Sequence, residues 1–328
     1  MSTADAKRFR LLDICSGAGG LALGLEQAGF EPVLLLDNRP VVCETLRLNR
    51  PNWTVLEADL LDFDPVEHPE AYDVDLLSAG LPRVRAIAAS ARRDRDYERR
   101  LLEATVLLMH AVQPRALLIE NVAELATGEA FAPIRAFMQA ELEHLGYQYR
   151  WFVVNAADFG VPQSRKQGIL VAFKGLDIDS FMPPERLLDQ HLTVGDALYE
   201  SMASKGWPDA EAWAAQAGRL APTIVGGSWE RGGPDLGPSG AKRSWARLGV
   251  DGGTIADDVP GSDFHWDPAL GRQGLVRLTV AQVARLQGFP DDWRIAGAKT
   301  ARYRQVGEAC PPPVARALGL SIAQTLGW

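Results

Sequence analysis

The sequence predicts an α/β fold: a mostly parallel sheet with helices on both faces, followed by a smaller, loop-rich part. Short apolar runs alternate with longer amphipathic stretches over residues 1–175, and this alternation is typical of such a sheet. After Gly175 the chain becomes rich in Gly, Pro and Trp and has few periodic runs. The Trp side chains of that part need burial or stacking partners, which favours a folded domain over a disordered linker.

The expected elements follow one another in a regular order. Strands are expected at 11–14, 33–36, 74–77, 116–119, 149–155 and 169–173. Helices are expected from the turn after the first strand to about Ala28, at 41–49, 99–112, 134–145 and 280–286, and after Pro313. In such a sheet ligands bind at the carboxyl ends of the strands, so residues that follow strands are the first candidates for a site.

Length and composition limit the class of protein. The chain has 328 residues, of which 47% are hydrophobic and 23% charged, which suits a globular protein with one large and one smaller domain. No apolar run approaches the ~20 residues that a membrane span needs, and the first residues lack the apolar region of a signal peptide. With only Cys15, Cys43 and Cys310, we expect neither a disulfide framework nor a metal site, and a reducing, prokaryotic cytoplasm.

The net charge of −8 counts mildly against a protein coated in nucleic acid, but a local basic face decides DNA binding. One basic cluster comprises Arg83, Arg85, Arg92, Arg93, Arg95, Arg99 and Arg100. Acidic residues alternate with it, so a solvated helix face and a DNA contact both remain open at this point.

A glycine-rich turn, DICSGAGG at 13–20, follows the first strand and opens the first helix. Glycines allow main-chain N–H groups to approach a ligand closely, and a helix N-terminus favours negative charge. Asp37 ends the second strand, where a carboxylate accepts hydrogen bonds from ribose hydroxyls, and Asp59 follows the next strand. The ordered series indicates a nucleoside-containing cofactor, although a tight turn without a ligand remains open. The absence of a GxGxxG pattern disfavours nicotinamide cofactors.

Four further segments carry a family resemblance. IENV at 119–122 resembles the ENV motif of cytosine-C5 DNA methyltransferases, and NAADFGVPQSR at 155–165 resembles the segment leading into that family's QxRxR motif. RLTV at 277–280 with RLQGFP at 285–290, and YRQVGEACPPPVA at 303–315, resemble its last two motifs. With the glycine-rich turn, these segments cover 1–175 and 277–328.

The resemblance implies a Rossmann-like, S-adenosylmethionine-dependent catalytic domain at 1–175 and 277–328, with a target-recognition domain at 176–276. It also implies a substrate of double-stranded DNA whose target base is flipped out of the helix. Glu120 would bind the Watson–Crick edge of the flipped cytosine, and Arg165 would orient the base or a flanking phosphate. The residues expected to hold the cofactor are Asp13, Cys15, Gly17, Ala18, Gly19, Gly20, Asp37, Asn38, Asp59, Leu60 and Gly80.

The chain departs from the family at the catalytic loop. Residues 80–87 read GLPRVRAI, where the family has a Gly-Pro-Pro-Cys type of sequence, so Arg83 stands at the place of the nucleophilic cysteine. That thiolate adds to C6 of cytosine and makes C5 electron-rich, whereas arginine remains protonated and offers no lone pair. The second Arg of QxRxR is Gln167, and the Asn of the final motif is Glu308.

Three hypotheses follow. In the first, which we favour, the methyl group goes to the exocyclic N4 of cytosine, with Glu120 and a main-chain carbonyl near Leu81 or Pro82 accepting the amine hydrogens and Arg83 binding the base or a phosphate. In the second, C5 is methylated with another activator, such as Cys15 or a water. In the third, the chain is a non-enzymatic DNA-binding regulator.

The recognition segment mixes glycines, aromatic residues and basic residues at 226–240 and 242–247. Basic side chains there could read guanine edges, although a surface loop without base contacts remains open. The expected DNA-binding residues are Arg85, Gln163, Gln167 and Arg243. We expect a monomer without membrane attachment and a restriction–modification context with a cognate endonuclease.

Overall fold

The structure, a computed structural model, describes residues 8–84, 94–187, 190–227, 229 and 232–327. The chain divides into two compact units. The first unit comprises residues 1–154, 166–185 and 314–328, and the second comprises 155–165 and 186–313. No helix within the described residues is both long and apolar enough to cross a membrane.

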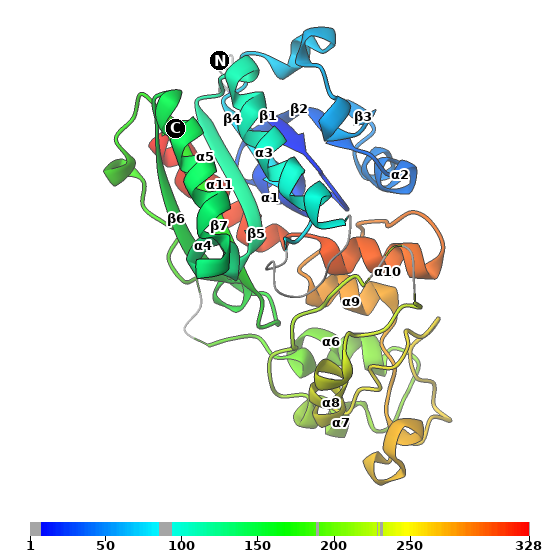
Figure 1. Cartoon of the computed structure of the whole chain (residues 1–328). Coiled ribbons are helices and arrows are strands. Elements are labelled where there is room, and N and C mark those ends of the chain that lie inside the picture. Colours follow the sequence, from blue (N-terminus) through cyan, green and yellow to red (C-terminus); the bar gives the residue numbers. More distant parts are fainter. Residues whose placement is uncertain (1–7, 85–93, 188–189, 228, 230–231, 328) are drawn as a thin grey trace, which may run out of the picture. The chain divides into compact units, whose positions relative to one another are not determined.

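A seven-stranded sheet forms the centre of the first unit, with strand order β3-β2-β1-β4-β5-β7-β6 (Figure 1). The strands are β1 (Phe9–Ile14), β2 (Phe30–Asp37), β3 (Val55–Glu57), β4 (Leu76–Gly80), β5 (Ala116–Val122), β6 (Tyr147–Asn155) and β7 (Lys166–Lys174). The neighbours from β3 to β5 pair in parallel, and β7 pairs with β5 in the antiparallel sense. The predicted α/β class and mostly parallel sheet are therefore confirmed.

Helices pack on both faces of this sheet, namely α1 (Gly20–Gln27), α2 (Pro40–Asn49), α3 (Asp94–Val112), α4 (Ala123–Thr127), α5 (Ala132–His144) and α11 (Pro312–Thr325). Strand residues such as Leu12, Leu77 and Leu117 are fully buried, because a parallel sheet is covered on both sides. This double burial explains why the strands appear in the sequence as continuous apolar runs.

The C-terminal helix α11 completes the first unit. A Cβ atom at Gly319 would lie 2.7 Å from the Cβ of Ala28, so glycine allows α11 to approach the end of α1. Arg115, which directly precedes β5, donates a hydrogen bond of 2.9 Å to the main-chain oxygen of Leu326. Residues separated by most of the chain therefore share one core.

The second unit contains α6 (Val194–Ala203), α7 (Ala210–Gln216), α8 (Ser239–Arg247), α9 (Val280–Leu286) and α10 (Lys299–Glu308). Of these, only α9 was predicted, because the others lie in a part of the chain that is rich in glycine and proline. An aromatic cluster supplies much of the core: the Trp207 ring lies 6.3 Å from that of Trp213 and 6.5 Å from that of Trp266. The Trp-rich composition thus reflects a folded unit, as expected.

The boundaries of the units differ from those expected from the sequence. Residues 155–165 and 277–313, which the family motifs led us to group with the cofactor domain, belong by their contacts to the second unit. The reason is local packing: α9 contacts both α6 and α10, and Gln282 of α9 donates to Ser201 of α6 at 3.1 Å. The assignment of 176–276 to target recognition remains a prediction.

Arg165 ties the second unit together. Its guanidinium is 1% exposed and donates to the main-chain oxygens of Ile224 at 2.8 Å, Ala309 at 3.1 Å and Gly307 at 3.4 Å. The expectation that Arg165 contacts a base or a phosphate does not fit this geometry, because its donors face buried carbonyl groups. This residue of the QxRxR-like motif therefore stabilises the main chain of the second unit.

Replacing Arg165 tests this role. In Arg165→Met the three buried carbonyl groups lose their donor, and each such loss costs about 1–3 kcal/mol. We expect the free energy of unfolding to fall by about 3 kcal/mol or more, measured by urea unfolding with tryptophan fluorescence. The exposed Arg243 gives the control, since Arg243→Met should change stability by less than about 0.5 kcal/mol. Equal stability of the two variants would contradict the structural role.

Candidate active site

The glycine-rich turn connects β1 to α1 at the carboxyl edge of the sheet. Cys15, Gly17 and Gly19 have positive φ angles of 52°, 54° and 82°, and Gly19 is the N-cap of α1. The Ser16 N–H donates to the Leu36 carbonyl at 3.0 Å, which fixes the turn against β2. A Cβ atom at Gly17 would meet no atom within 4 Å, so open space adjoins the main chain there.

Asp37, the last residue of β2, joins the turn to the neighbouring strand. One carboxylate oxygen accepts from the Gly17 N–H at 2.9 Å and the other from the Arg39 N–H at 3.0 Å. Burial raises the pKa of this carboxyl group, while these two hydrogen bonds oppose the change. Asp37 therefore lies beside the open space at Gly17, where the sequence predicts ribose contacts.

Asp59 lies two residues after β3 and collects three donors. The Leu61 N–H donates to Oδ1 at 2.9 Å, while the Tyr97 hydroxyl and the Asn38 amide donate to Oδ2 at 2.7 and 3.2 Å. Although desolvation opposes it, these hydrogen bonds lower the pKa of Asp59. Tyr97 was not predicted as a site residue, because it lies in a charged stretch of α3 far from any motif.

The predicted cofactor residues fall into two groups. Cys15, Gly17, Asp37, Asn38 and Asp59 have partly exposed groups or adjoin open space. The rest support the turn from within the protein. Fully buried Asp13 is hydrogen-bonded to Ser78, and burial raises its pKa to about 7. The other buried members of this group are Ala18, Gly19, Gly20 and Leu60. Gly80 is partly exposed, and a Cβ there would lie 3.3 Å from the Cys15 carbonyl oxygen.

The loop after β4 is held by the side chain of Asn121 at the end of β5. The Asn121 amide nitrogen donates to the main-chain oxygens of Leu81 and Pro82 at 3.3 and 3.2 Å. Its oxygen accepts from the N–H of Val84 at 3.1 Å. Because Asn121 is 2% exposed, these bonds are shielded from water and fix the main chain on both sides of Arg83.

Arg83 is partly exposed, and no hydrogen bond or ion pair joins its guanidinium to another side chain in the part of the chain that the structure describes. The structure therefore puts a cationic side chain at the position for which the resemblance implies a nucleophile. Arg85 lies outside the described residues.

Glu120 precedes Asn121 and is 6% exposed. One of its carboxylate oxygens accepts a hydrogen bond of 2.7 Å from the side-chain amide of Gln167. Gln167 lies opposite Val122 where β7 pairs with β5, so the antiparallel pairing brings the two motifs together. Among the described residues, no group donates to its second oxygen. Gln167 is 1% exposed, so its expected contact with DNA does not fit; instead it positions Glu120.

None of the three cysteines has the surroundings of an activated nucleophile. The pKa of Cys15 is raised by burial and by the charges of Asp37, Asp13 and Asp59. Burial and Asp37 raise the pKa of Cys43 to about 11, and Cys310 is buried. A thiol must ionise to attack, so these surroundings disfavour each of them.

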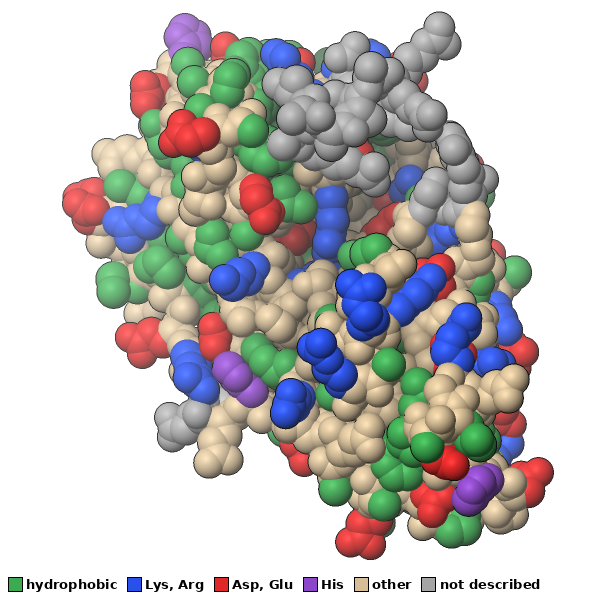
Figure 2. Space-filling view, turned by 60° about the horizontal axis from the view of Figure 1, so that its bottom comes forward, with side chains coloured by type: hydrophobic (Ala, Val, Ile, Leu, Met, Phe, Trp, Pro, Cys, Tyr) green, Lys and Arg blue, Asp and Glu red, His purple; other side chains and the backbone are tan. Residues whose placement is uncertain are grey.

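The remaining predicted DNA contacts lie in the second unit. Gln163 is fully buried and donates to Gln287 at 2.7 Å, so it does not fit a DNA-binding role. Arg243 is exposed on α8, which leaves its role a prediction. Figure 2 shows several Lys and Arg side chains close together on the face that it draws, so basic surface exists despite the net charge of −8.

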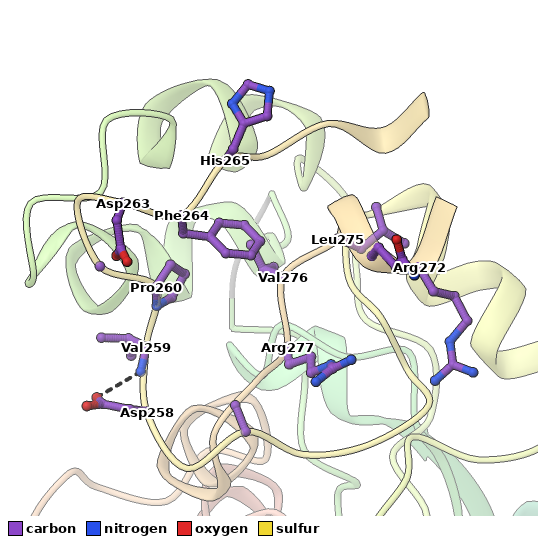
Figure 3. A pocket seen from close by; sticks show the side chains of 13 residues that line it. Asp258, Val259, Pro260, Asp263, Phe264, His265, Arg272, Leu275, Val276 and Arg277 are labelled. Carbon is purple, nitrogen blue, oxygen red and sulfur yellow. Dashed lines mark hydrogen bonds between the residues drawn. The ribbon is translucent and has the colours of Figure 1, made fainter. Parts of the chain in front are cut away.

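A separate hollow of about 640 Å³ lies in the second unit, lined in part by Phe264, His265 and Arg277 (Figure 3). Arg272 and Arg277, which both line this hollow, form ion pairs with the buried Asp251 at 2.9 and 3.1 Å. Their charges are therefore already paired within the protein. The hollow contains no predicted site residue. The described residues hold no cluster of three or more potential metal ligands.

Comparison with known proteins gives consistent matches. The C-5 cytosine-specific DNA methylase family matches residues 9–223 and 247–324. The chain is 42% identical to the type II methyltransferase M.NaeI of Lentzea aerocolonigenes, covering 97% of this chain and 75% of that protein. It is 37% identical to the type II methyltransferase M.NgoMIV of Neisseria gonorrhoeae, covering 97% and 98%.

Solved structures agree in fold. The S. pombe Dnmt2 methyltransferase has a TM-score of 0.65 with 19% identity, covering 98% of this chain and 100% of that one. This likeness confirms the methyltransferase fold that the motifs imply. Because the family matches most of the sequence, and because both relatives are similar to this chain over 97% of its length, this chain belongs to the C-5 cytosine-specific DNA methylase family.

Proposed function

We propose that this protein binds S-adenosylmethionine and double-stranded DNA, accepts a flipped cytosine at Glu120, and methylates the exocyclic N4 of that base. The observation that carries the proposal has two parts: hydrogen bonds hold the loop after β4 and the Glu120 carboxylate in place, and Arg83 stands at the position for which the family resemblance implies a cysteine. Asn121 holds the loop around Arg83, and Gln167 holds Glu120. The names of the relatives, type II methyltransferases, support methylation of DNA.

The residues of the turn suit this cofactor. Asp37 adjoins the open space at Gly17 and would accept hydrogen bonds from the ribose hydroxyls. Asp59, with the exposed Asn38 beside it, would meet the adenine. When bound, S-adenosylmethionine supplies an electrophilic methyl group. The protein's task is then to hold the accepting atom in line with that group.

Methylation at C5 is disfavoured by the chemistry of the residues present. C5 becomes a nucleophile only after a thiolate has added to C6, and Arg83 has no lone pair for this addition. Cys15, the alternative activator, has a raised pKa, so little thiolate would be available at neutral pH. A water in place of the thiolate would need a general base to deprotonate it. In this proposal Glu120 binds the Watson–Crick edge of the cytosine and does not take that role.

N4 transfer requires no covalent intermediate. The amine attacks directly if acceptors draw on its hydrogens and orient its lone pair. The second oxygen of Glu120 is one such acceptor. The carbonyl oxygens of Leu81 and Pro82 are others, since each carbonyl has two lone pairs and accepts one hydrogen bond from Asn121. The Arg83 guanidinium would bind the base O2 or a phosphate.

A second candidate function is DNA binding without catalysis. The specific observation in its favour is that Asn121 already donates to both carbonyl groups that N4 transfer needs. If these bonds persist with DNA bound, one lone pair of each carbonyl oxygen stays occupied, and Asn121 competes with the amine for these acceptors. The protein would then recognise a flipped cytosine and regulate through binding alone.

A monomeric state, a cytoplasmic location and a cognate restriction endonuclease are part of the same proposal. Type II methyltransferases among the relatives support the restriction–modification context. One flipped base requires one active site, which supports a monomer.

Nucleoside analysis of treated DNA tests the reaction. Purified protein is incubated with mixed-sequence duplex DNA and S-adenosylmethionine, and the digested nucleosides are measured by mass spectrometry. We expect N4-methyldeoxycytidine, because no group activates C5. A 5-methyl product would refute the proposal. Absence of both products, from protein that binds cofactor and DNA, would favour the second candidate.

The role of Glu120 is tested by Glu120→Gln, which keeps the size of the side chain and removes its charge. Transfer should fall by about 100-fold or more, as for the loss of a positioned acid–base group, while cofactor affinity stays unchanged. Glu31→Gln, at an exposed position, is the matched control. Unchanged methylation in Glu120→Gln would remove this residue from the mechanism.

Arg83→Cys tests whether the loop presents position 83 to the base. With S-adenosylmethionine present, the new thiolate, held by the Asn121-anchored main chain, should add to C6, and the methyl group should then pass to C5. C5 then carries fluorine and has no proton to lose, so the thiolate cannot be eliminated, and we expect a denaturant-resistant complex with DNA that contains 5-fluorodeoxycytidine. Arg83→Ser, which lacks a thiol, should form no such complex. If Arg83→Cys also forms none yet binds this DNA, position 83 does not face the base.

A further inference from the structure

Asp59 has nearly exhausted its capacity to accept hydrogen bonds. A carboxylate offers about four lone-pair sites, and Asp59 accepts from Leu61, Tyr97 and Asn38. Both sites of Oδ2 are used, one by the Tyr97 hydroxyl at 2.7 Å and one by the Asn38 amide at 3.2 Å. A ligand donor that needs Oδ2 must therefore displace one of these two groups.

Tyr97 is the group that faces this competition. The Leu61 N–H, in the 3-10 turn at Leu60–Asp62 that Asp59 caps, donates to the other oxygen, Oδ1, and so takes no part in the competition for Oδ2. Asn38 also donates to the Tyr97 oxygen at 3.0 Å, so the two side chains form one small network. The Tyr97 hydroxyl makes the shortest of the three bonds to the carboxylate.

Tyr97 lies at the predicted cofactor site, although α3 carries no family motif. Its partly buried ring packs against the same core as Cys15, Ala58 and Leu61. Burial and the hydrogen bond to Asp59 raise the pKa of Tyr97, and Cys15 of the glycine-rich turn adds to the effect. A residue from α3 thus reaches the turn between β1 and α1 and the acid after β3.

We propose that the Tyr97 hydroxyl competes with the adenine amino group of the cofactor for Oδ2 of Asp59, and so sets the affinity of the site. This inference rests on the proposed function, in which Asp59 meets the adenine while Asp37 meets the ribose. Tyr97 is a positioning residue here: it holds Asp59 and Asn38 in place, and its hydroxyl must leave Oδ2 when the adenine amino group donates to that oxygen.

Calorimetric titration with S-adenosylhomocysteine, which binds without turnover, tests the competition. Tyr97→Phe keeps the ring and removes the hydroxyl, so we expect the Kd to fall about fivefold, the equivalent of one net hydrogen bond. Tyr149→Phe is the matched control, because the Tyr149 hydroxyl also donates to a carboxylate, Glu143, at 2.7 Å but away from the turn. Its Kd should equal that of the wild type.

An analogue of S-adenosylhomocysteine with purine in place of adenine gives the specific readout. It lacks the amino group, so Tyr97→Phe should bind it no more tightly than the wild type does. An unchanged or larger Kd for S-adenosylhomocysteine, or an equal gain with both ligands, overturns the inference while leaving the proposed function intact.

A wild-type protein that binds neither ligand overturns the proposed function and, with it, the competition. Circular dichroism confirms that each variant is folded, and Tyr97→Met, which also lacks the hydroxyl, replaces Tyr97→Phe if that variant does not fold.

Discussion

The buried side chain of Asn121 is the interaction on which the candidate site depends. It donates to the main-chain oxygens of Leu81 and Pro82 and accepts from the N–H of Val84 in the loop after β4, and these groups would be costly to leave unpaired in a buried position. The loop is therefore fixed beside Glu120 whatever residue stands at position 83. The main chain on both sides of position 83 therefore keeps these hydrogen bonds with an arginine there.

Hydrogen bonds from buried or partly buried side chains also organise the carboxyl edge of the sheet. Asp37 joins β2 to the turn after β1 through the Gly17 N–H, and Asp59 joins the end of β3 to α3 through Tyr97. Parallel strands bring these carboxyl ends together, so short polar contacts connect residues far apart in the chain. Each carboxylate stabilises the fold, and in the proposed function each also offers an acceptor to the cofactor.

Buried polar side chains also build the second unit. Arg165 and Gln163 bind main-chain carbonyls and Gln287 instead of solvent or ligand. A family motif of polar residues suggests recognition when only the sequence is known, because such residues are mostly exposed. Here their donors satisfy main-chain carbonyl groups in the irregular segment at Ile224 and near the C-terminal ends of α9 and α10, and this explains how a loop-rich unit can be ordered.

The sequence by itself determined the α/β class, the family, and the series along the chain of glycine-rich turn, Asp37 and Asp59. Apolar periodicity and motif spacing are local properties, so they can be recognised without the structure. The sequence located β1, β2, β5 and α9 closely, but not the helices α6, α7, α8 and α10, which lie in a part of the chain rich in glycine and proline. Only the tertiary structure decided which polar residues face inward. Burial of Arg165, Gln163 and Gln167, and the contact of Tyr97 with Asp59, depend on segments that are distant in sequence, so no local pattern could indicate them.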